Sequence, residues 1–310
     1  MTYSKVTYVY KTVHDCKIQA DIYRLRGEER RPAILWLHGG ALIFGSRTML
    51  PGEQMELYLA AGYTVIAIDY RLAPETKLQG ILVDIQDAHD WVCEEGPRLF
   101  GIDRNRIAVI GHSAGGYLAL MAGLRAQRRP KALVSFYGYG DIAGEWYSQP
   151  DPHYSKDPAV SPEVARQGVG GSILAESQLD DFPDRRWLFY LFCRQQGLWP
   201  QEITGYDPHT EPRAFDTLCP VRNVTPDYPP TLLLHGDQDT DVPLALSQQM
   251  AAALQEQHVA HQLIIMKGQG HVFDLFPQDL LEGQPGGLKH PKVAQAFDEV
   301  VTFLNKHMDR

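Results

Sequence analysis

A serine stands at the centre of a glycine-flanked pentapeptide, which runs Gly111-His112-Ser113-Ala114-Gly115. The residues before it, 106–110, have the composition of a buried strand, and the residues after it, 114–126, are small and have helical spacing. A sharp turn from strand to helix lifts the central hydroxyl clear of the sheet. It needs glycine on both sides because side chains there collide with the neighbouring strand and helix. This context predicts that Ser113 is a nucleophile.

A serine hydroxyl needs a general base before it can attack a carbonyl at neutral pH. The candidate base is His271, which lies in the glycine-containing loop 268–273 after an expected strand at 262–266. That position places it on the same edge of the sheet as Ser113. We therefore expect His271 to accept the proton of the serine.

An acidic residue should orient the imidazole, and in this arrangement it lies between the nucleophile and the histidine in the chain. Asp237, Asp239 and Asp241 meet that condition in a loop after the expected strand 231–235. Asp239 is favoured because it takes the acidic position of the pattern H-G-x-x-D-x-x-V-P, which is common in such loops. Asp241 is interpreted as the cap of a helix that begins near Pro243.

A glycine-rich turn, His38-Gly39-Gly40-Ala41, follows a short apolar run at 33–37. Acyl transfer builds negative charge on the carbonyl oxygen, and a preorganised backbone N–H stabilises that charge by roughly 3–4 kcal/mol. We expect the N–H groups of Gly40, Ala41 and Ala114 to form this oxyanion hole. An ordinary tight turn is the alternative, and the G-x-S-x-G motif downstream argues against it.

Strands alternate with helices along most of the chain, which predicts an α/β fold whose mostly parallel central sheet has helices on both faces. The expected strands are 3–10, 16–25, 33–37, 63–68, 106–110, 131–137, 231–235 and 262–266, and the main expected helices are 53–61, 82–95, 114–126, 243–257 and 292–306. Residues 139–228 break this alternation and are rich in Pro, Asp and aromatics, with helices expected at 162–167 and 187–196. We interpret 139–228 as a cap inserted at the carboxyl ends of the strands, with 1–138 and 229–310 forming the core. The alternative for 139–228 is a disordered linker, which its aromatic content disfavours.

Composition bounds the classes of function. The chain has 310 residues, 44% of them hydrophobic, and a net charge of −9, so a phosphate-binding surface for nucleic acid is not expected. It contains no run of about 18 apolar residues that would span a membrane, and its first residues lack the pattern of a secretory signal. The four cysteines are scattered without metal-ligand spacing, so we expect free thiols, no metal and a cytoplasmic protein.

Taken together, these motifs and the segment Asp69-Tyr70-Arg71-Leu72-Ala73-Pro74-Glu75 resemble the hormone-sensitive-lipase-like branch of the α/β-hydrolases, over roughly residues 30 to 305. The resemblance implies the α/β-hydrolase fold, ester hydrolysis without metal or cofactor, and triad roles for Ser113, Asp239 and His271. Two positions depart from the family pattern. Ala41 replaces the last glycine of H-G-G-G but keeps its N–H. His112 replaces the common aspartate, as in arylformamidase-like and acetylesterase-like relatives, which leaves the substrate class open.

We therefore expect a carboxylesterase that acts on small-molecule esters of small to medium acyl chain through an acyl-enzyme. Amide, peptide or arylformamide cleavage would use the same residues. A non-catalytic small-molecule receptor on this fold is expected to have lost a triad member, and none is missing. The sequence does not identify substrate-binding residues or the oligomeric state, and a homodimer is compatible with it.

Several polar and aromatic residues near the motifs receive structural interpretations instead. The segment 69–75 is expected to brace the sheet edge and the His-Gly-Gly turn. His112 is expected to pack beneath the nucleophile turn, and His235 to shape the acid loop. The aromatic side chains at 187–192 either line an acyl pocket or pack the cap.

Overall fold

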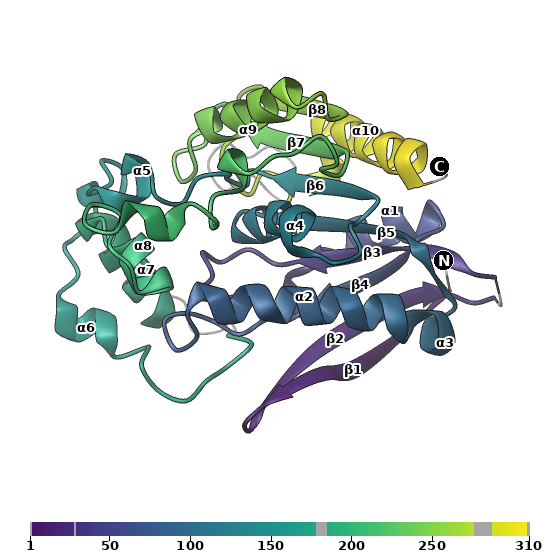
Figure 1. Cartoon of the computed structure of the whole chain (residues 1–310), viewed down its shortest axis with the longest axis horizontal. Helices are drawn as coiled ribbons and strands as arrows, with labels where there is room; N and C mark the ends of the chain where they lie inside the picture. The colour runs from purple at the N-terminus through teal and green to yellow at the C-terminus, as the bar shows by residue number, and fades with distance from the viewer. Residues whose placement is uncertain (1, 28, 178–184, 276–286, 309–310) are drawn as a thin grey trace.

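The fold is built on one sheet. The computed structural model describes residues 2–27, 29–177, 185–275 and 287–308, and in these residues eight strands lie in the order β1-β2-β4-β3-β5-β6-β7-β8 (Figure 1). The strands are β1 (Tyr3–Val13), β2 (Cys16–Leu25), β3 (Arg31–Leu37), β4 (Thr64–Ile68), β5 (Ile102–His112), β6 (Ala132–Phe136), β7 (Thr231–Gly236) and β8 (His261–Met266). The strands from β3 to β8 pair in parallel, and the β1–β2 hairpin joins β4 antiparallel. The predicted mostly parallel sheet is therefore confirmed.

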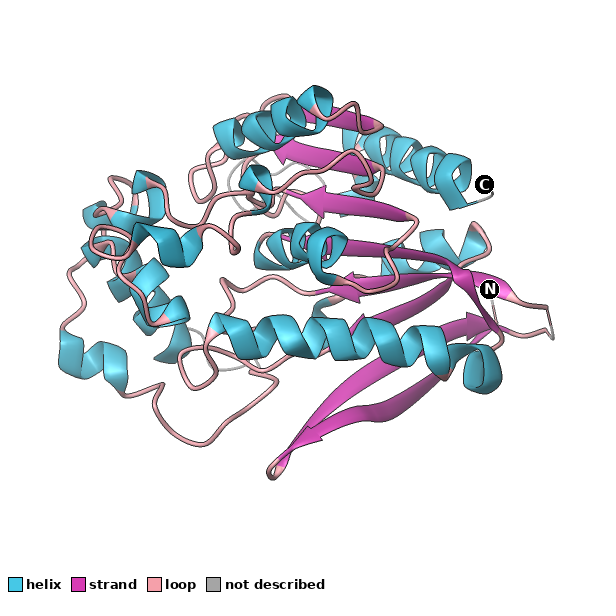
Figure 2. Ribbon diagram, in the orientation of Figure 1, coloured by secondary structure: helices cyan, strands magenta, loops and turns pink. Residues whose placement is uncertain are grey.

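Helices cover both faces of this sheet, as Figure 2 shows. On one face lie α2 (Leu78–Glu94), α3 (Gly96–Phe100), α4 (Ala114–Arg125) and α9 (Leu244–Glu256), and on the other lie α1 (Gly52–Ala60) and α10 (Pro291–Met308). Successive residues of a strand point to opposite faces. Leu35 of β3 accordingly joins the core beneath α2 and α4, and Trp36 joins the core beneath α1 and α10. Both faces are buried, which explains why these strands are continuous apolar runs.

The chain between β6 and β7 forms an insertion at the end of the sheet toward which these two strands point (Figure 1). It contains α5 (Glu145–Ser148), α6 (Pro162–Arg166), α7 (Arg185–Gln196) and α8 (Trp199–Thr204), with short 3-10 helices at Tyr154–Lys156, Pro212–Phe215 and Pro220–Arg222. Phe189 and Trp199 are fully buried in it. Arg186 ties it to the core by donating to the Ile43 carbonyl at 2.6 Å. The described residues of the insertion are therefore packed, which argues against the disordered-linker interpretation.

The structure also describes the state of the thiols and the lengths of the helices. Cys16, Cys93, Cys193 and Cys219 are free. Across the described ranges, no helix has both the length and the apolar character needed to cross a bilayer.

Candidate active site

Ser113 lies on a strained turn between β5 and α4. Its φ is 54°, in the left-handed region that non-glycine residues rarely adopt. A Cβ at Gly111 would lie 2.0 Å from the Gly115 carbonyl oxygen, and one at Gly115 would lie 2.2 Å from the Leu37 carbonyl oxygen. Both glycines are therefore required for this close approach of strand and helix, as the motif predicts.

The structure brings Ser113, His271 and Asp239 together from three separate loops. His271, which follows β8, places Nε2 at 3.1 Å from Ser113 Oγ. Its Nδ1 lies 2.7 Å from Oδ2 of Asp239, which follows β7. Asp237, the competing acid, instead accepts a hydrogen bond from the Gly268 N–H at 2.7 Å. The three residues thus have the relative positions of a nucleophile, a base and an orienting acid.

The carboxylate of Asp239 is buried and surrounded by donors. Its Oδ1 accepts the backbone N–H groups of Asp241 and Val242 at 2.9 and 2.8 Å, and its Oδ2 also lies 3.2 Å from His235 Nε2. Burial alone raises the pKa of Asp239, but His271 and these donors outweigh it and hold the pKa well below its ordinary range. An ionised Asp239 favours a proton on Nδ1 of His271, which leaves Nε2 free to accept one. His235 therefore helps to shape the acid loop, as expected.

The pKa of His271 is set by opposing effects. Burial lowers this pKa, the charges of Asp241 and Asp239 raise it, and the net pKa lies above its ordinary value. The ring of Tyr137 packs edge-on against the imidazole, with ring centroids 4.6 Å apart. His271 is therefore held in one orientation and attracts a proton more strongly than a histidine in water.

The His-Gly-Gly turn lies directly beside the nucleophile. A Cβ at Gly39 would lie 3.4 Å from the Cβ of Ser113. Gly40 has a φ of +100°, and a Cβ there would lie 2.0 Å from the Phe44 carbonyl oxygen, so no other residue fits without movement. Ala41 follows with a φ of 53°. The turn therefore presents its backbone to the space beside Ser113.

The other predicted donor, Ala114, is the first residue of α4. The first N–H groups of a helix have no acceptor within it, so this group is available to a ligand. The insertion fixes the facing turn, because Trp199 Nε1 donates to the Ala41 carbonyl at 3.0 Å. Ala114 directly follows Ser113 and the His-Gly-Gly turn lies beside it, so both segments expected to form the oxyanion hole are next to Ser113.

The segment 69–75 braces this turn, as the sequence suggests. The Tyr70 hydroxyl donates to the His38 carbonyl at 2.8 Å, and its ring stacks on the His38 ring at 4.1 Å. Glu75 forms an ion pair with Arg186 of the insertion at 2.8 Å. These contacts connect the sheet edge, the turn and the insertion.

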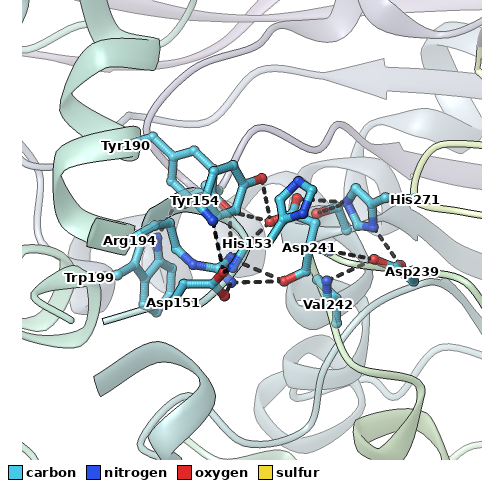
Figure 3. Close-up of polar contacts among 12 residues, drawn as sticks. Asp151, His153, Tyr154, Tyr190, Arg194, Trp199, Asp239, Asp241, Val242 and His271 are labelled. Atoms are coloured by element: carbon cyan, nitrogen blue, oxygen red, sulfur yellow. Dashed lines mark hydrogen bonds and ion pairs between the residues drawn. The ribbon is translucent and has the colours of Figure 1, made fainter. Parts of the chain in front are cut away.

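Asp241 is the residue beside the site whose surroundings the sequence interpretation misjudged. The N-cap of α9 is Pro243 and no side chain caps that helix, so the expectation that Asp241 does so is wrong. Figure 3 shows the carboxylate among side chains of the insertion. Its Oδ1 accepts from the Tyr154 and Tyr190 hydroxyls at 2.9 and 2.5 Å and from Arg194 Nη1 at 2.8 Å. Its Oδ2 lies 3.3 Å from His271 Nε2.

The aromatic side chains at 187–192 have several environments. Phe189 and Phe192 are buried in the insertion, whereas the half-buried Trp187 packs against Phe44 with ring centroids 5.9 Å apart. Tyr190 is buried and binds Asp241. Packing of the insertion therefore accounts for Phe189 and Phe192.

His112 is fully buried beneath the nucleophile turn, as expected, and stacks on Phe136 with ring centroids 4.4 Å apart. Its partner, Asp274, was not anticipated from the sequence. Asp274 Oδ2 lies 2.8 Å from His112 Nε2 and accepts a further hydrogen bond from Gln54 Nε2 at 2.8 Å. No local sequence pattern links these three positions.

The fold and this site place the chain among the α/β-hydrolases. A family model described as alpha/beta hydrolase fold matches residues 34–275, and the chain belongs to this hydrolase fold-3 family. Family membership supports a hydrolase.

Solved structures share the fold. An α/β-hydrolase superfamily protein from Enterococcus faecalis superposes with a TM-score of 0.73 at 24% identity, covering 98% of this chain and 100% of that one. Esterase 2 from Thermogutta terrifontis, phosphoramylated by tabun, superposes with a TM-score of 0.65 at 21% identity, covering 96% and 94%.

Curated relatives are much longer proteins. The chain is 29% identical to part of the non-reducing polyketide synthase Preu6 of Preussia isomera over 88% of its own length. It is 27% identical to part of the synthase adrD of Penicillium rubens over 94% of its length. The match spans only 14% and 13% of those two proteins.

Proposed function

We propose that the protein is a serine hydrolase that cleaves carboxylic esters of small to medium acyl chain through an acyl-enzyme. The observation that carries this proposal is the connected arrangement of Ser113, His271 and Asp239, with contacts of 3.1 and 2.7 Å. Hydrogen-bond reach between nucleophile and base, with the base oriented by a third group, is what activates a serine hydroxyl.

In the proposed reaction His271 Nε2 accepts the proton of Ser113 as Oγ bonds to the ester carbonyl carbon. The N–H groups of Gly40, Ala41 and Ala114 stabilise the oxyanion that forms. The carbon–oxygen bond to the alcohol then breaks, and His271 gives its proton to the leaving oxygen. Water, deprotonated by the same His271, attacks the acyl-enzyme, and the acid leaves as Ser113 regains its proton. Asp239 stabilises the imidazolium throughout.

The acyl range draws support from a protein of the same fold. Esterase 2 from Thermogutta terrifontis has been solved with butyrate and with propionate bound, and also phosphorylated by paraoxon. We take these short carboxylates as a guide to the acyl groups of this chain, as part of the proposal. The insertion, residues 139–228, would act as the cap that bounds the acyl group.

The test is hydrolysis of p-nitrophenyl acetate, butyrate and octanoate, with butyryl anilide beside them, by the wild type and by Ser113→Ala. We expect ester turnover that falls by roughly a thousandfold or more in Ser113→Ala, with acetate and butyrate preferred over octanoate. Turnover of the anilide without the esters would indicate an amide hydrolase with the same residues. Absence of turnover on every substrate would favour a non-catalytic receptor.

A further inference from the structure

The two carboxylate oxygens of Asp241 have different surroundings. Oδ1 accepts hydrogen bonds from Tyr154, Tyr190 and Arg194, whereas Oδ2 faces His271 Nε2 at 3.3 Å (Figure 3). The same Nε2 lies 3.1 Å from Ser113 Oγ. In ester cleavage the leaving oxygen must take a proton from this nitrogen. Oδ2 of Asp241 therefore lies beside the position of the leaving alcohol.

The insertion holds Asp241 in this orientation. Arg194 is 1% exposed, donates to Asp241 and also forms an ion pair with Asp151. Its guanidinium lies 4.9 Å from the ring centroids of Tyr147 and Tyr154, a cation–π arrangement that fixes it. Because three donors occupy Oδ1, the carboxylate cannot rotate away from the active site without losing them. Asp241 is a preorganised acceptor.

The charges around this acceptor do not balance. Within the group formed by Asp151, Arg194, Asp239, Asp241 and His271, three carboxylates meet one guanidinium when the imidazole is neutral. The side chain of Asp239 is completely buried, and that of Asp151 is 11% exposed. The side chain of Asp241 is 20% exposed and is therefore the carboxylate that an incoming group reaches most readily.

We propose that Asp241 determines specificity for the leaving group, selecting esters whose alcohol carries a positively charged hydrogen-bond donor such as a protonated tertiary amine. This inference rests on the proposed esterase function. The substrate ammonium donates its N–H to Oδ2 of Asp241. Oδ2 then no longer competes for the proton on His271 Nε2, which remains directed at the leaving oxygen.

The test compares two butyrate esters of nearly the same shape. Dimethylaminoethyl butyrate carries an ammonium at neutral pH, and isopentyl butyrate has a CH group at the same place. The ratio of their kcat/KM values, corrected by the ratio of their hydroxide-catalysed rates, isolates recognition of the charge. We expect a corrected ratio of about tenfold or more in the wild type, as for a hydrogen bond to a charged group. Asp241→Asn should reduce it by about tenfold.

Asp237→Asn is the matched control, because it also removes a carboxylate from this loop. The carboxylate of Asp237 accepts a hydrogen bond from the Gly268 N–H and does not contact His271 or Asp241. Asp237→Asn should leave the ratio unchanged. A ratio near one in the wild type, or one unaffected by Asp241→Asn, would overturn the proposal.

A second measurement needs no variant. Dimethylaminoethanol should inhibit wild-type hydrolysis of p-nitrophenyl butyrate at concentrations about tenfold lower than isopentanol does, and equal inhibition would also overturn the proposal. The protein could hydrolyse p-nitrophenyl butyrate with Ser113 and yet show neither the preferred ester nor the stronger inhibition by dimethylaminoethanol. That result would contradict the leaving-group role of Asp241 alone. Loss of that hydrolysis contradicts the esterase function itself.

Discussion

Asp274 Oδ2 lies 2.8 Å from His112 Nε2, and this contact joins the loop of His271 to the strand end that carries Ser113. Both side chains are fully buried. Burial raises the pKa of Asp274, but His112, Tyr137 and Gln54 outweigh it and leave this pKa lowered. The contact therefore couples an ionised carboxylate to the backbone segments that hold the nucleophile and its base.

Replacing Asp274 should destabilise the protein strongly. Asp274→Ala leaves His112 Nε2 without its carboxylate partner in a buried site, while Gln54 keeps only its hydrogen bond to the carbonyl of residue 274. We expect a loss of about 3–5 kcal/mol in the free energy of unfolding. Urea unfolding measures this loss. The lowered pKa means that the contribution is present above the pKa of the unfolded chain and disappears as pH falls through the folded value.

The control is an exposed ion pair, Glu95 with Arg98. Glu95→Ala should change the free energy of unfolding by about 0.5 kcal/mol or less. Equal losses in the two variants would contradict a special role for the buried pair.

The proposed role of Asp239 as the acid that orients His271 can be tested with two neighbouring aspartates. Asp239→Asn should lower kcat/KM by roughly ten-thousandfold, because an amide neither fixes the His271 tautomer nor stabilises its charged form. Asp237→Asn should change it by no more than about twofold, as for a surface substitution. The measurement is p-nitrophenyl butyrate hydrolysis, and equal activity in the two variants would show that the acid is assigned wrongly.

The proposed role of the His-Gly-Gly turn as an oxyanion hole can be tested by comparing two glycines of similar φ. Gly40 has a φ of +100° and no room for a Cβ, whereas Gly62 has a φ of +93° and open space around it. Gly40→Ala should lower kcat by about a hundredfold or more because the donors of the turn must shift. Gly62→Ala should leave kcat unchanged and cost about 1 kcal/mol in stability. Similar kcat values in the two variants would mean that the turn does not take part in the reaction.

The charge of Asp241 should affect how kcat/KM depends on pH. His271 must be neutral to accept a proton, so kcat/KM rises with pH through its pKa. Burial lowers this pKa and so does the charge of Arg194. The charges of Asp241 and Asp239 raise it, as does the hydrogen bond that His271 donates to Asp239, and the net pKa is raised. Asp241→Asn removes one raising charge, and the acid limb for neutral p-nitrophenyl butyrate should therefore move to lower pH. A limb that stays in place would show that Asp241 does not act on the imidazole.

Much of this site could be predicted because its chemistry is encoded locally. The strained turn at Ser113 needs glycines two residues away on each side, and the loops of Asp239 and His271 directly follow short apolar strands. Sheet topology then brings these strand ends to one edge. The sequence also predicted the strands themselves, although β5 begins at Ile102 rather than 106, since its first residue pairs with Arg31.

The features that the sequence did not predict depend on contacts between distant segments. Asp241 binds Arg194 across 47 positions, and Asp274 binds His112 across 162. An aspartate just before a helix has the local pattern of a cap. Asp241 instead binds side chains of the insertion, which pack against its loop. The short helices α3, α5 and α8 have too few turns to produce a periodic pattern.

The central claim is that Ser113 is a nucleophile activated by His271. Paraoxon transfers a diethylphosphoryl group to an activated serine, and mass spectrometry of the digested protein locates it. We predict one adduct, on the peptide that contains Ser113, absent in Ser113→Ala and formed far more slowly in His271→Ala. An adduct on another residue, or none on the folded wild type, would contradict the account.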